Sequence, residues 1–324
     1  MYDVITLGET MYRLTPPSFQ RVAQATQFNI EIGGSESNTA VGLAQLGMTV
    51  AWLSRLTDNA LGRRITQTLQ GYDVDTSHVV WTDADRVGLY FMEEGQPPRP
   101  TQVTYDRAGS AISRMTVADL PQPLFTAGQA RLLHLTGITA ALSESAHQVV
   151  HQAMVWGKAA GWKISFDINY RAKLWSPQAA VAGCEALAQL ADVILLPLRD
   201  AQLLYAAPSD PVACLDYLHG RWPHARLILT LGADGAMALD HNGQHIQQAA
   251  FPATPIGRIG GGDAFTAGFL YALLTDPDDL QTALRWGAAM AALKYTLPGD
   301  LPIVRRDDVL ALLGQGNDGG SVHR

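Results

Sequence analysis

The sequence has few charged residues and only two cysteines. Charged residues make up 16% of the 324 residues, and the formal net charge is −7. The basic residues are dispersed, so no run of Lys and Arg marks a surface for nucleic acid or for an anionic membrane. Cys184 and Cys214 are far apart and form no C-x-x-C pair, which argues against a disulfide framework and against a zinc ribbon. We expect two buried thiols in a reducing compartment.

Long apolar runs and several familiar catalytic motifs are also missing. No uninterrupted apolar stretch reaches the roughly 18 residues of a membrane-spanning helix. The start, "MYDVITLGET", lacks the basic segment and apolar core of a signal peptide. We therefore expect a cytoplasmic protein. No H-E-x-x-H, nucleophile elbow or Walker A pattern occurs, which argues against zinc peptidases, α/β-hydrolases and P-loop enzymes.

The apolar residues alternate between strand-like and helix-like segments. Short apolar runs predict strands buried on both faces at 4–8, 50–56, 131–137, 163–169, 192–197 and 226–232. Helical patterns lie between most of them, at 37–47, 60–71, 143–161 and 177–191. This alternation predicts an α/β fold with a doubly wound, mostly parallel sheet and helices on both faces.

Two segments, 11–32 and 84–107, interrupt this alternation. Both contain β-branched and aromatic residues in alternating patterns without a helix between them, which predicts antiparallel strands outside the main sheet, as a lid. We expect one domain over residues 1–313 that carries this small sheet. The polar, glycine-rich tail at 314–324 is expected to be disordered. An exposed lid edge would favour pairing of two copies, so a homo-oligomer is expected.

The stretch "GRIGGGDAFTAGFL" places Gly260, Gly261 and Gly262 directly before Asp263 and an apolar helix. Glycines ahead of a helix leave backbone N–H groups free to converge on an anion at the positive end of the helix dipole. A carboxylate held there could accept a proton from an attacking hydroxyl. The alternative is a tight turn followed by an ordinary first-turn acid, which accounts for one glycine more easily than for three.

The stretch "IEIGGSESNTAVGLAQLG" joins a strand-like segment to a helix through Gly33 and Gly34. The glycines let a ligand approach the backbone, and Asn38 can both donate to and accept from a hydroxyl. The alternative is a plain turn in which Ser35 or Ser37 caps the helix.

The stretch "FDINYRAKLW" follows a predicted buried strand, and ligands of open α/β sheets bind at such strand ends. It carries Asp167, Asn169 and Arg171, and the guanidinium of Arg171 could bind a carboxylate or phosphate through two parallel hydrogen bonds. A solvated surface loop is the alternative, and the aromatic neighbours weaken it.

The stretch "TLGADGAM", residues 230–237, has two glycines around an acid after a predicted strand. On physical grounds alone this pattern predicts a hairpin turn and no ligand site.

Taken in order, the four motifs resemble the ribokinase-like (PfkB) carbohydrate kinases, over residues 3 to about 310. The most specific parts are "GGSESNTAVGLAQLG" and "GRIGGGDAFTAGFL", the second of which is similar to the family's D-T-x-G-A-G-D-x-F signature. The resemblance implies a three-layer α/β/α fold with a mostly parallel central sheet and a small β-sheet lid. It also implies transfer of the γ-phosphate of ATP to a sugar hydroxyl with Mg²⁺.

The resemblance implies roles for particular residues. Asp263 matches the catalytic base and Gly260, Gly261 and Gly262 the anion hole, while Gly33, Gly34 and Asn38 match sugar-contacting positions and Thr230, Gly232 and Gly235 the nucleotide-binding strand and loop.

Within the family, "DINYRAKLW" and "VTYDRAGSA" resemble the 2-keto-3-deoxygluconate kinases. Carried over, Arg107 and Arg171 would bind the carboxylate of a sugar acid, with Tyr90 and Tyr105 packing or hydrogen-bonding nearby. An acid substrate gives a physical reason for two arginines, which a neutral sugar does not need.

The sequence departs from the family pattern in three places. Gly257 stands where the family commonly has an Asp that helps bind a monovalent cation, so activation by potassium is not expected. The Asn-x-x-Glu linked to magnesium is not evident in "LLPLRDAQLL", where Asp200 is the nearest acid, and the metal ligands stay unassigned. Gly261 replaces the usual Ala and keeps its N–H.

The leading hypothesis is an ATP- and magnesium-dependent kinase that phosphorylates the terminal hydroxyl of 2-keto-3-deoxygluconate or a close relative. One alternative is the same chemistry on a neutral sugar such as fructose or ribose, or on a nucleoside. The other is a non-catalytic sugar or nucleotide sensor on the same fold.

Overall fold

The computed structural model describes residues 1–240, 243–257 and 259–314. Of the segment expected to be a disordered tail, only Gly314 is described, at the end of helix α10 (Arg306–Gly314), and the rest lies outside the described residues. Within the described ranges no helix combines the length and the apolarity that crossing a membrane requires.

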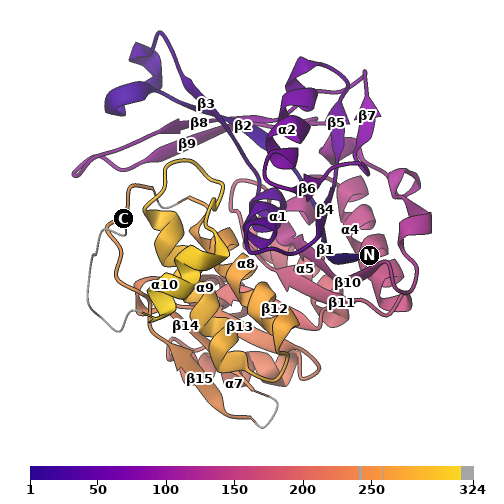
Figure 1. Cartoon of the computed structure of the whole chain (residues 1–324), viewed down its shortest axis with the longest axis vertical. Helices are drawn as coiled ribbons and strands as arrows, with labels where there is room; N and C mark the ends of the chain where they lie inside the picture. The colour runs from indigo at the N-terminus through magenta and orange to yellow at the C-terminus, as the bar shows by residue number, and fades with distance from the viewer. Residues whose placement is uncertain (241–242, 258, 315–324) are drawn as a thin grey trace.

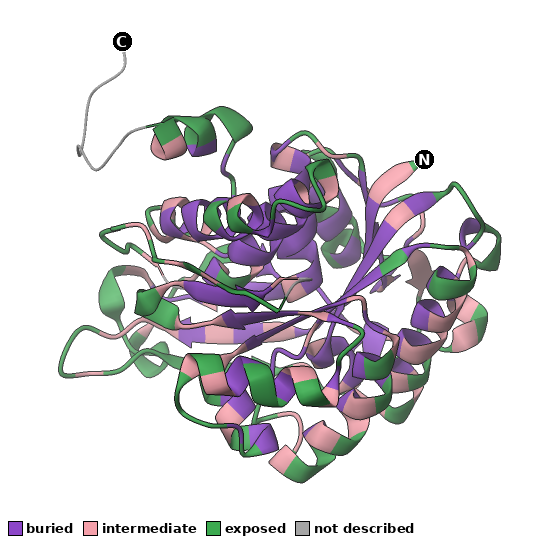
Figure 2. Ribbon diagram, turned by 90° about the horizontal axis from the view of Figure 1, so that it is seen from below, coloured by how far each residue is buried: buried purple, intermediate pink, exposed green. Residues whose placement is uncertain are grey.

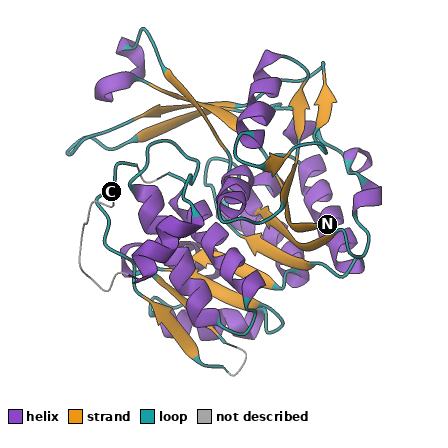
Figure 3. Cartoon of the chain, in the orientation of Figure 1, coloured by secondary structure: helices purple, strands orange, loops and turns teal. Residues whose placement is uncertain are grey.

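The largest sheet has nine strands in the order β15-β14-β13-β12-β11-β10-β1-β4-β6 (Figures 1 and 3). In chain order they are β1 (Tyr2–Leu7), β4 (Val50–Leu53), β6 (Val74–Asp75), β10 (Ala130–Thr136), β11 (Lys163–Asp167), β12 (Val193–Pro197), β13 (Arg226–Thr230), β14 (Ala236–Leu239) and β15 (His245–Gln248). Every neighbouring pair of strands from β6 to β13 in this order is parallel. The last two pairs, β13 with β14 and β14 with β15, are antiparallel. The predicted mostly parallel sheet is confirmed.

Helices cover both faces of this sheet, and alternate residues of one strand serve the two faces. In β1, Val4 packs in a cluster with the helices at 35–45, 60–70, 261–275, 280–295 and 306–314, whereas Ile5 and Leu7 pack with the helices that lie between residues 137 and 221. The side-chain period of a strand is two, so a strand covered on both faces is apolar throughout. Figure 2 shows the buried strands between two helical layers with exposed outer surfaces.

The helices have the following bounds: α1 (Ser35–Gln45), α2 (Ala60–Gln70), α3 (Gly137–Ala140), α4 (Glu144–Ala159), α5 (Pro177–Leu190), α6 (Leu198–Tyr205), α7 (Pro211–Arg221), α8 (Gly261–Thr275) and α9 (Leu280–Tyr295), with short 3₁₀ helices at Pro17–Phe19, Val22–Gln24, Ile112–Arg114, Val117–Asp119, Gln122–Leu124 and Gly232–Asp234. The four predicted helical segments correspond to α1, α2, α4 and α5.

The predicted strand at 50–56 is divided in two. β4 ends at Leu53, and β5 (Arg55–Thr57) pairs in parallel with β7 (Val80–Thr82) in a separate two-stranded sheet. Ser54 lies at the break, and its hydroxyl donates to the carbonyl oxygen of Gly8 (2.8 Å). The chain therefore leaves the main sheet where the neighbouring strand β1 also ends.

The lid is a four-stranded sheet that projects from one end of the molecule (Figure 1). Its order is β3 (Asn29–Gly33), β2 (Met11–Thr15), β8 (Leu89–Glu93) and β9 (Gln102–Asp106). The expectation of antiparallel strands is correct for the two outer pairs, but the central pair, β2 and β8, is parallel. No hairpin joins β2 to β8, since the chain passes through the main sheet between them and can return in the same direction. The single domain and the pairing of two copies through the lid stay predictions.

A buried polar cluster lies beneath the start of α1. The carboxylate of Glu36, which is 1% exposed, accepts hydrogen bonds from the hydroxyls of Thr136 and Thr139, both 2.7 Å long. Burial raises the pKa of Glu36 from 4.5 to about 7, although the two hydroxyls act in the opposite direction. Glu36 therefore takes up a proton on folding near neutral pH.

This proton uptake gives a testable dependence of stability on pH. Between pH 4.5 and 7 the folded state holds a proton on Glu36 that the unfolded state has lost, so this group's contribution to stability falls as the pH rises. The pKa change corresponds to about 3 kcal/mol. We expect the unfolding free energy of Glu36→Gln, relative to wild type, to increase by about that amount across this window in denaturant titrations. The exposed Glu144→Gln is the control, and a parallel pH profile for Glu36→Gln and wild type would contradict the assignment.

Candidate active site

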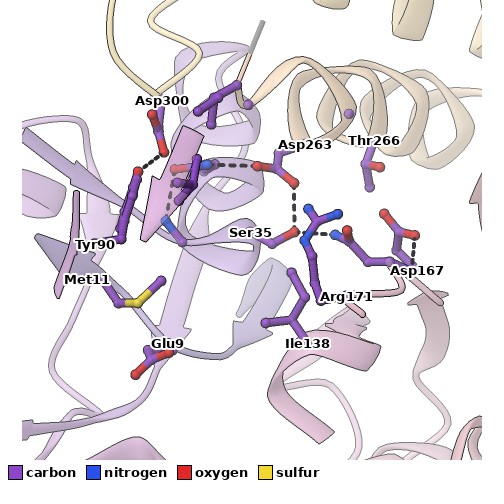
Figure 4. Close-up of a pocket in the computed structure, with 18 of the residues that line it drawn as sticks. Glu9, Met11, Ser35, Tyr90, Ile138, Asp167, Arg171, Asp263, Thr266 and Asp300 are labelled. Atoms are coloured by element: carbon purple, nitrogen blue, oxygen red, sulfur yellow. Dashed lines mark hydrogen bonds between the residues drawn. The ribbon is translucent and has the colours of Figure 1, made fainter. Parts of the chain in front are cut away.

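A cavity of about 480 Å³ lies between the lid, the ends of the central strands and the start of helix α8 (Figure 4). Strands β11, β12 and β13 contribute their carboxyl ends through Asp167, Pro197 and Thr230. The lid contributes Tyr90 and its neighbour Tyr105. The cavity therefore has the position at which ligands bind in open α/β sheets, at the carboxyl edge.

The three glycines form the turn that begins α8. Gly260 is the residue before the helix and has a φ of 81°, a left-handed conformation. A Cβ on Gly260 would lie 2.1 Å from the carbonyl oxygen of Asp300, and one on Gly261 would lie 2.3 Å from the ring of Tyr295. A Cβ on Gly262 would meet nothing within 4 Å. The first N–H groups of a helix have no partner inside the helix, so Gly262 leaves them accessible from the cavity.

Asp263 is held by two side chains of α1. Its Oδ1 accepts a hydrogen bond from the hydroxyl of Ser35 (2.6 Å), and its Oδ2 accepts one from the amide nitrogen of Asn38 (2.7 Å). Burial raises the pKa of Asp263 above its usual range, and the two bonds and the charge of Arg171 oppose this rise. Asn38 lines the cavity, and it also orients this carboxylate.

The segment after β11 completes one wall of the cavity. Asn169 has a φ of 41°; its backbone N–H donates to Asp167 Oδ1 (3.0 Å), and its amide nitrogen donates to Ser35 Oγ (2.9 Å). Burial, together with the charge of Asp263, raises the pKa of Asp167 to about 8, and the charge of Arg171 lowers it. Figure 4 shows the Arg171 side chain reaching towards these carboxylates. The predicted set Asp167, Asn169 and Arg171 is brought together with Asp263.

The lid side of the cavity holds two further polar pairs. Arg107 donates through Nε and Nη2 to Glu9 Oε2, and its guanidinium lies 5.5 Å from the centre of the Tyr105 ring. The hydroxyl of Tyr90 donates to Asp300 Oδ2. Tyr90, Tyr105 and Arg107 therefore all line the cavity, as do Gly33 and Gly34 at the start of α1.

Three of the lining residues that make these contacts, Ser35, Glu9 and Asp300, are not predicted from the sequence as site residues. The sequence pattern indicates a helix cap at Ser35, but Gly34 precedes the helix, and the Ser35 hydroxyl donates to Asp263 instead. Glu9 and Asp300 lie outside the four sequence motifs. Glu9 could have been found from its position directly after β1, at the same sheet edge as Asp167, whereas no local signal marks Asp300.

The segment from β13 to β14 forms the predicted hairpin. The two strands are antiparallel, and the turn contains Gly232 and Gly235 with φ values of 64° and 99°. Thr230, at the end of β13, lines the cavity, while the two glycines lie in the turn beyond the lining residues.

Comparison with known proteins identifies the fold and the chemistry. The sequence matches the pfkB family carbohydrate kinases over residues 1–303. The chain belongs to this family. It is therefore a carbohydrate kinase, a phosphotransferase that uses ATP.

The relatives of this PfkB kinase include enzymes named for sugar acids. A 2-dehydro-3-deoxygalactonokinase of Haloferax volcanii is 38% identical over 318 residues, which cover 98% of each chain. A 2-dehydro-3-deoxygluconokinase of Bacillus subtilis is 32% identical and covers 92% of this chain and 91% of its own. The crystal structure of 2-dehydro-3-deoxygluconokinase from Thermotoga maritima superposes with a TM-score of 0.90 at 28% identity, over 97% of this chain and 100% of that chain.

The residues of this PfkB kinase fit Mg²⁺ bound mainly through phosphate. In the part of the chain that the structure describes, no group of three or more His, Cys, Asp or Glu side chains is placed to hold a metal ion. Mg²⁺ is commonly held by one or two carboxylates, substrate phosphates and water, so a protein cage is not needed. Asp167 lines the cavity, where it interacts with the charge of Asp263, and it is one carboxylate that would hold the ion there. Asp200 is 1% exposed and is paired with Arg199 (3.1 Å).

The turn before α8 gives a test of packing in this PfkB kinase. We expect Gly261→Ala to lower the unfolding free energy by about 1–3 kcal/mol, because the added methyl group would overlap the Tyr295 ring. Gly262→Ala, where the methyl group has open space, is the matched control and should leave the unfolding free energy nearly unchanged. Denaturant unfolding measures both. Gly261→Ala should lower the unfolding free energy less in a Tyr295→Ala background than in wild type, because the ring that the methyl group would overlap is then absent. Equal stability of the two single variants would contradict the packing argument.

Proposed function

We propose that the protein transfers the γ-phosphoryl group of ATP to a hydroxyl of a 2-keto-3-deoxy sugar acid, either the gluconate or the galactonate epimer. The observation that carries the proposal is one cavity in which Asp263, held by Ser35 and Asn38 at the start of α8, shares space with Arg107 and Arg171. The names of the relatives, which include both epimers, support the same substrate class.

In this proposal Asp263 acts as the base. Its carboxylate accepts the proton of the substrate hydroxyl while the hydroxyl oxygen forms a bond to the γ-phosphorus. The bond between that phosphorus and the oxygen bridging to the β-phosphorus breaks, and ADP leaves with the electron pair. A carboxyl pKa above its usual range makes Asp263 a better proton acceptor than an exposed aspartate.

The backbone of Gly260, Gly261 and Gly262 would hold the transferred phosphoryl group. Their N–H groups lie at the positive end of α8 and can donate to the oxygens on which negative charge is spread in the transition state. Mg²⁺, when bound with ATP beside Asp167, supplies further neutralisation of phosphate charge. Positioning and charge neutralisation dominate in phosphoryl transfer, which is the chemistry this wall of the cavity can provide.

The nucleotide would enter from the side of β13. Thr230 lines the cavity there, and the turn with Gly232 and Gly235 continues from it. We propose these three residues as nucleotide contacts. Gly33, Gly34, Asn38 and Asn169, which line the same cavity, would then face the sugar.

The substrate carboxylate would bind to Arg107 and Arg171, which both line the cavity. The guanidinium of Arg107 has five N–H donors and gives only part of them to Glu9, so it can still bind an anion. Arg171 is exposed to the cavity and can bind a carboxylate through two parallel bonds. Glu9 Oε1 is buried without a hydrogen-bond partner among the described residues, and a sugar hydroxyl could donate to it.

A neutral sugar remains the second candidate, and one observation favours it. The charge of Arg107 is already balanced by Glu9, so a neutral substrate would leave that pair undisturbed. Comparing sugar acids with fructose and ribose in one assay separates the two candidates.

The base role predicts a large loss of turnover in Asp263→Asn. Asparagine keeps the size of the side chain but cannot accept the proton, so kcat should fall by at least about 10²-fold with little change in KM. A coupled assay of ADP release measures this loss, with the exposed Asp278→Asn as the control. Activity of Asp263→Asn equal to wild type would overturn the assignment of Asp263 as the base.

The carboxylate role predicts a selective loss in arginine variants. Arg107→Gln and Arg171→Gln should each lower kcat/KM for the sugar acids by about tenfold to hundredfold, the value of a hydrogen bond between charged groups. Any turnover of neutral sugars should change less. The measurement is a panel of both 2-keto-3-deoxy epimers, fructose and ribose, with Arg285→Gln as the surface control. A loss of equal size for acids and neutral sugars would show that the arginines do not read the carboxylate.

A further inference from the structure

A fully buried lysine lies behind the anion cradle. Lys294 is in the last turn of α9 and is 0% exposed. Its Nζ donates to the carbonyl oxygens of Leu297 (3.2 Å) and Gly299 (2.9 Å), in the segment that follows the helix. A buried ammonium group is strongly unfavourable unless it is hydrogen-bonded and its charge is balanced, so its retention here calls for a function.

The lysine is in direct contact with the first residue of the cradle. A Cβ placed on Gly260 would lie 3.3 Å from Lys294 Cε and 2.1 Å from the carbonyl oxygen of Asp300. Asp300 follows the carbonyls that the ammonium holds, and its side chain lines the cavity. The ammonium, the segment at 297–300 and the start of α8 therefore form one packed unit.

The charges around Lys294 fit a cation at this position. The negative charges of Asp300, Glu31 and Asp263 favour the ammonium form and oppose the lowering of the lysine pKa by burial, while Arg13 acts against it. Asp300 is itself bound by Arg13 (2.6 Å). One buried carboxylate thus lies between two cations at the back of the site.

Gly257 is the position at which the family pattern has an aspartate that helps to bind a monovalent cation. A Cβ on Gly257 would lie 3.7 Å from the carbonyl oxygen of Leu297, one of the two oxygens that accept from Lys294. A hard cation needs oxygen ligands, and here the carboxylate is missing and the carbonyl is occupied by an ammonium group. The residues present therefore do not fit a bound alkali ion.

We propose that the Lys294 ammonium replaces a monovalent cation: by binding the carbonyls of Leu297 and Gly299 it fixes the segment whose next residue, Asp300, places its carbonyl against Gly260, and so it positions the anion cradle and makes phosphoryl transfer independent of potassium. Lys294 contacts no reacting atom, so it is a positioning residue. The inference rests on the proposed kinase function in its activity measurements, but its effect on folding can be measured without any substrate.

The first experiment needs no variant. Wild-type kcat is measured in potassium, sodium and tetramethylammonium chloride at equal ionic strength, with the sugar that is turned over best. Equal rates within about twofold are expected, because the internal cation is always present. A rate that depends on potassium would overturn the proposal.

The second experiment exchanges the two kinds of cation. Lys294→Ala should lower kcat by about tenfold to hundredfold in every salt, with a smaller change in KM for the sugar. The double variant Lys294→Ala with Gly257→Asp, which restores a carboxylate beside the Leu297 carbonyl, should regain much of this loss in potassium but not in tetramethylammonium. The exposed Lys163→Ala is the control. Wild-type kcat in folded Lys294→Ala would overturn the proposal.

Thermal unfolding gives a readout that is independent of activity. Potassium should raise the Tm of the double variant relative to tetramethylammonium and should leave the Tm of wild type unchanged. If wild type turns over no sugar, the kinase function fails while this measurement still decides the role of Lys294. A potassium-dependent Tm in wild type, or none in a folded double variant, would contradict the exchange. If neither variant folds, the salt response of wild-type Tm decides it.

Discussion

Two hydrogen bonds from α1 to Asp263 are the interaction on which the site depends. Ser35 and Asn38 each donate a hydrogen bond to one carboxylate oxygen of Asp263. They thereby join the beginnings of α1 and α8, which are more than two hundred residues apart in the chain. Asn169 extends this chain of bonds to the end of β11 through Ser35. A carboxylate fixed at both oxygens would need little reorganisation in the proposed role of base, which is what electrostatic preorganisation requires.

The site concentrates charge of both signs in a partly buried space. Burial is the main cause that raises the pKa of Asp167 and of Asp263. The charge of Asp263 adds to the rise at Asp167 and the charge of Asp300 to the rise at Asp263, and the charge of Arg171 opposes both. Lys294 and Arg13 balance Asp300 at the back of the same cavity. The positive charge at this cavity is therefore distributed among fixed side chains and the start of α8.

The lid shows where sequence patterns reach their limit. Alternating apolar residues correctly indicated strands at 11–32 and 84–107, but the parallel pairing of β2 with β8 could not be predicted from them. Period-two alternation says which residues share a face of a strand and nothing about its partner. The pairing partner of a strand and the direction of that pairing depend on where the intervening chain ends. For β2 and β8 this intervening chain includes the first part of the main sheet. For the same reason the sequence pattern does not predict the division of the strand at Ser54, because this division depends on where the neighbouring strand β1 ends.

Residues close together in the chain suffice to predict the layered α/β architecture, the helix that begins at the glycine turn, and the position of Asp263 directly after three glycines. The sequence also marks Gly257 as an unusual residue. Three contacts are seen only in the folded chain: Ser35 with Asp263, Glu9 with Arg107, and Lys294 beside Gly260. These contacts join segments that are far apart in the chain, so neither the periodicity of apolar residues nor the spacing within a motif predicts them. The polar contacts are stronger because they are buried away from water. A lysine in the last turn of a helix has the same local pattern whether its ammonium is in water or, as here, buried beside the glycine turn.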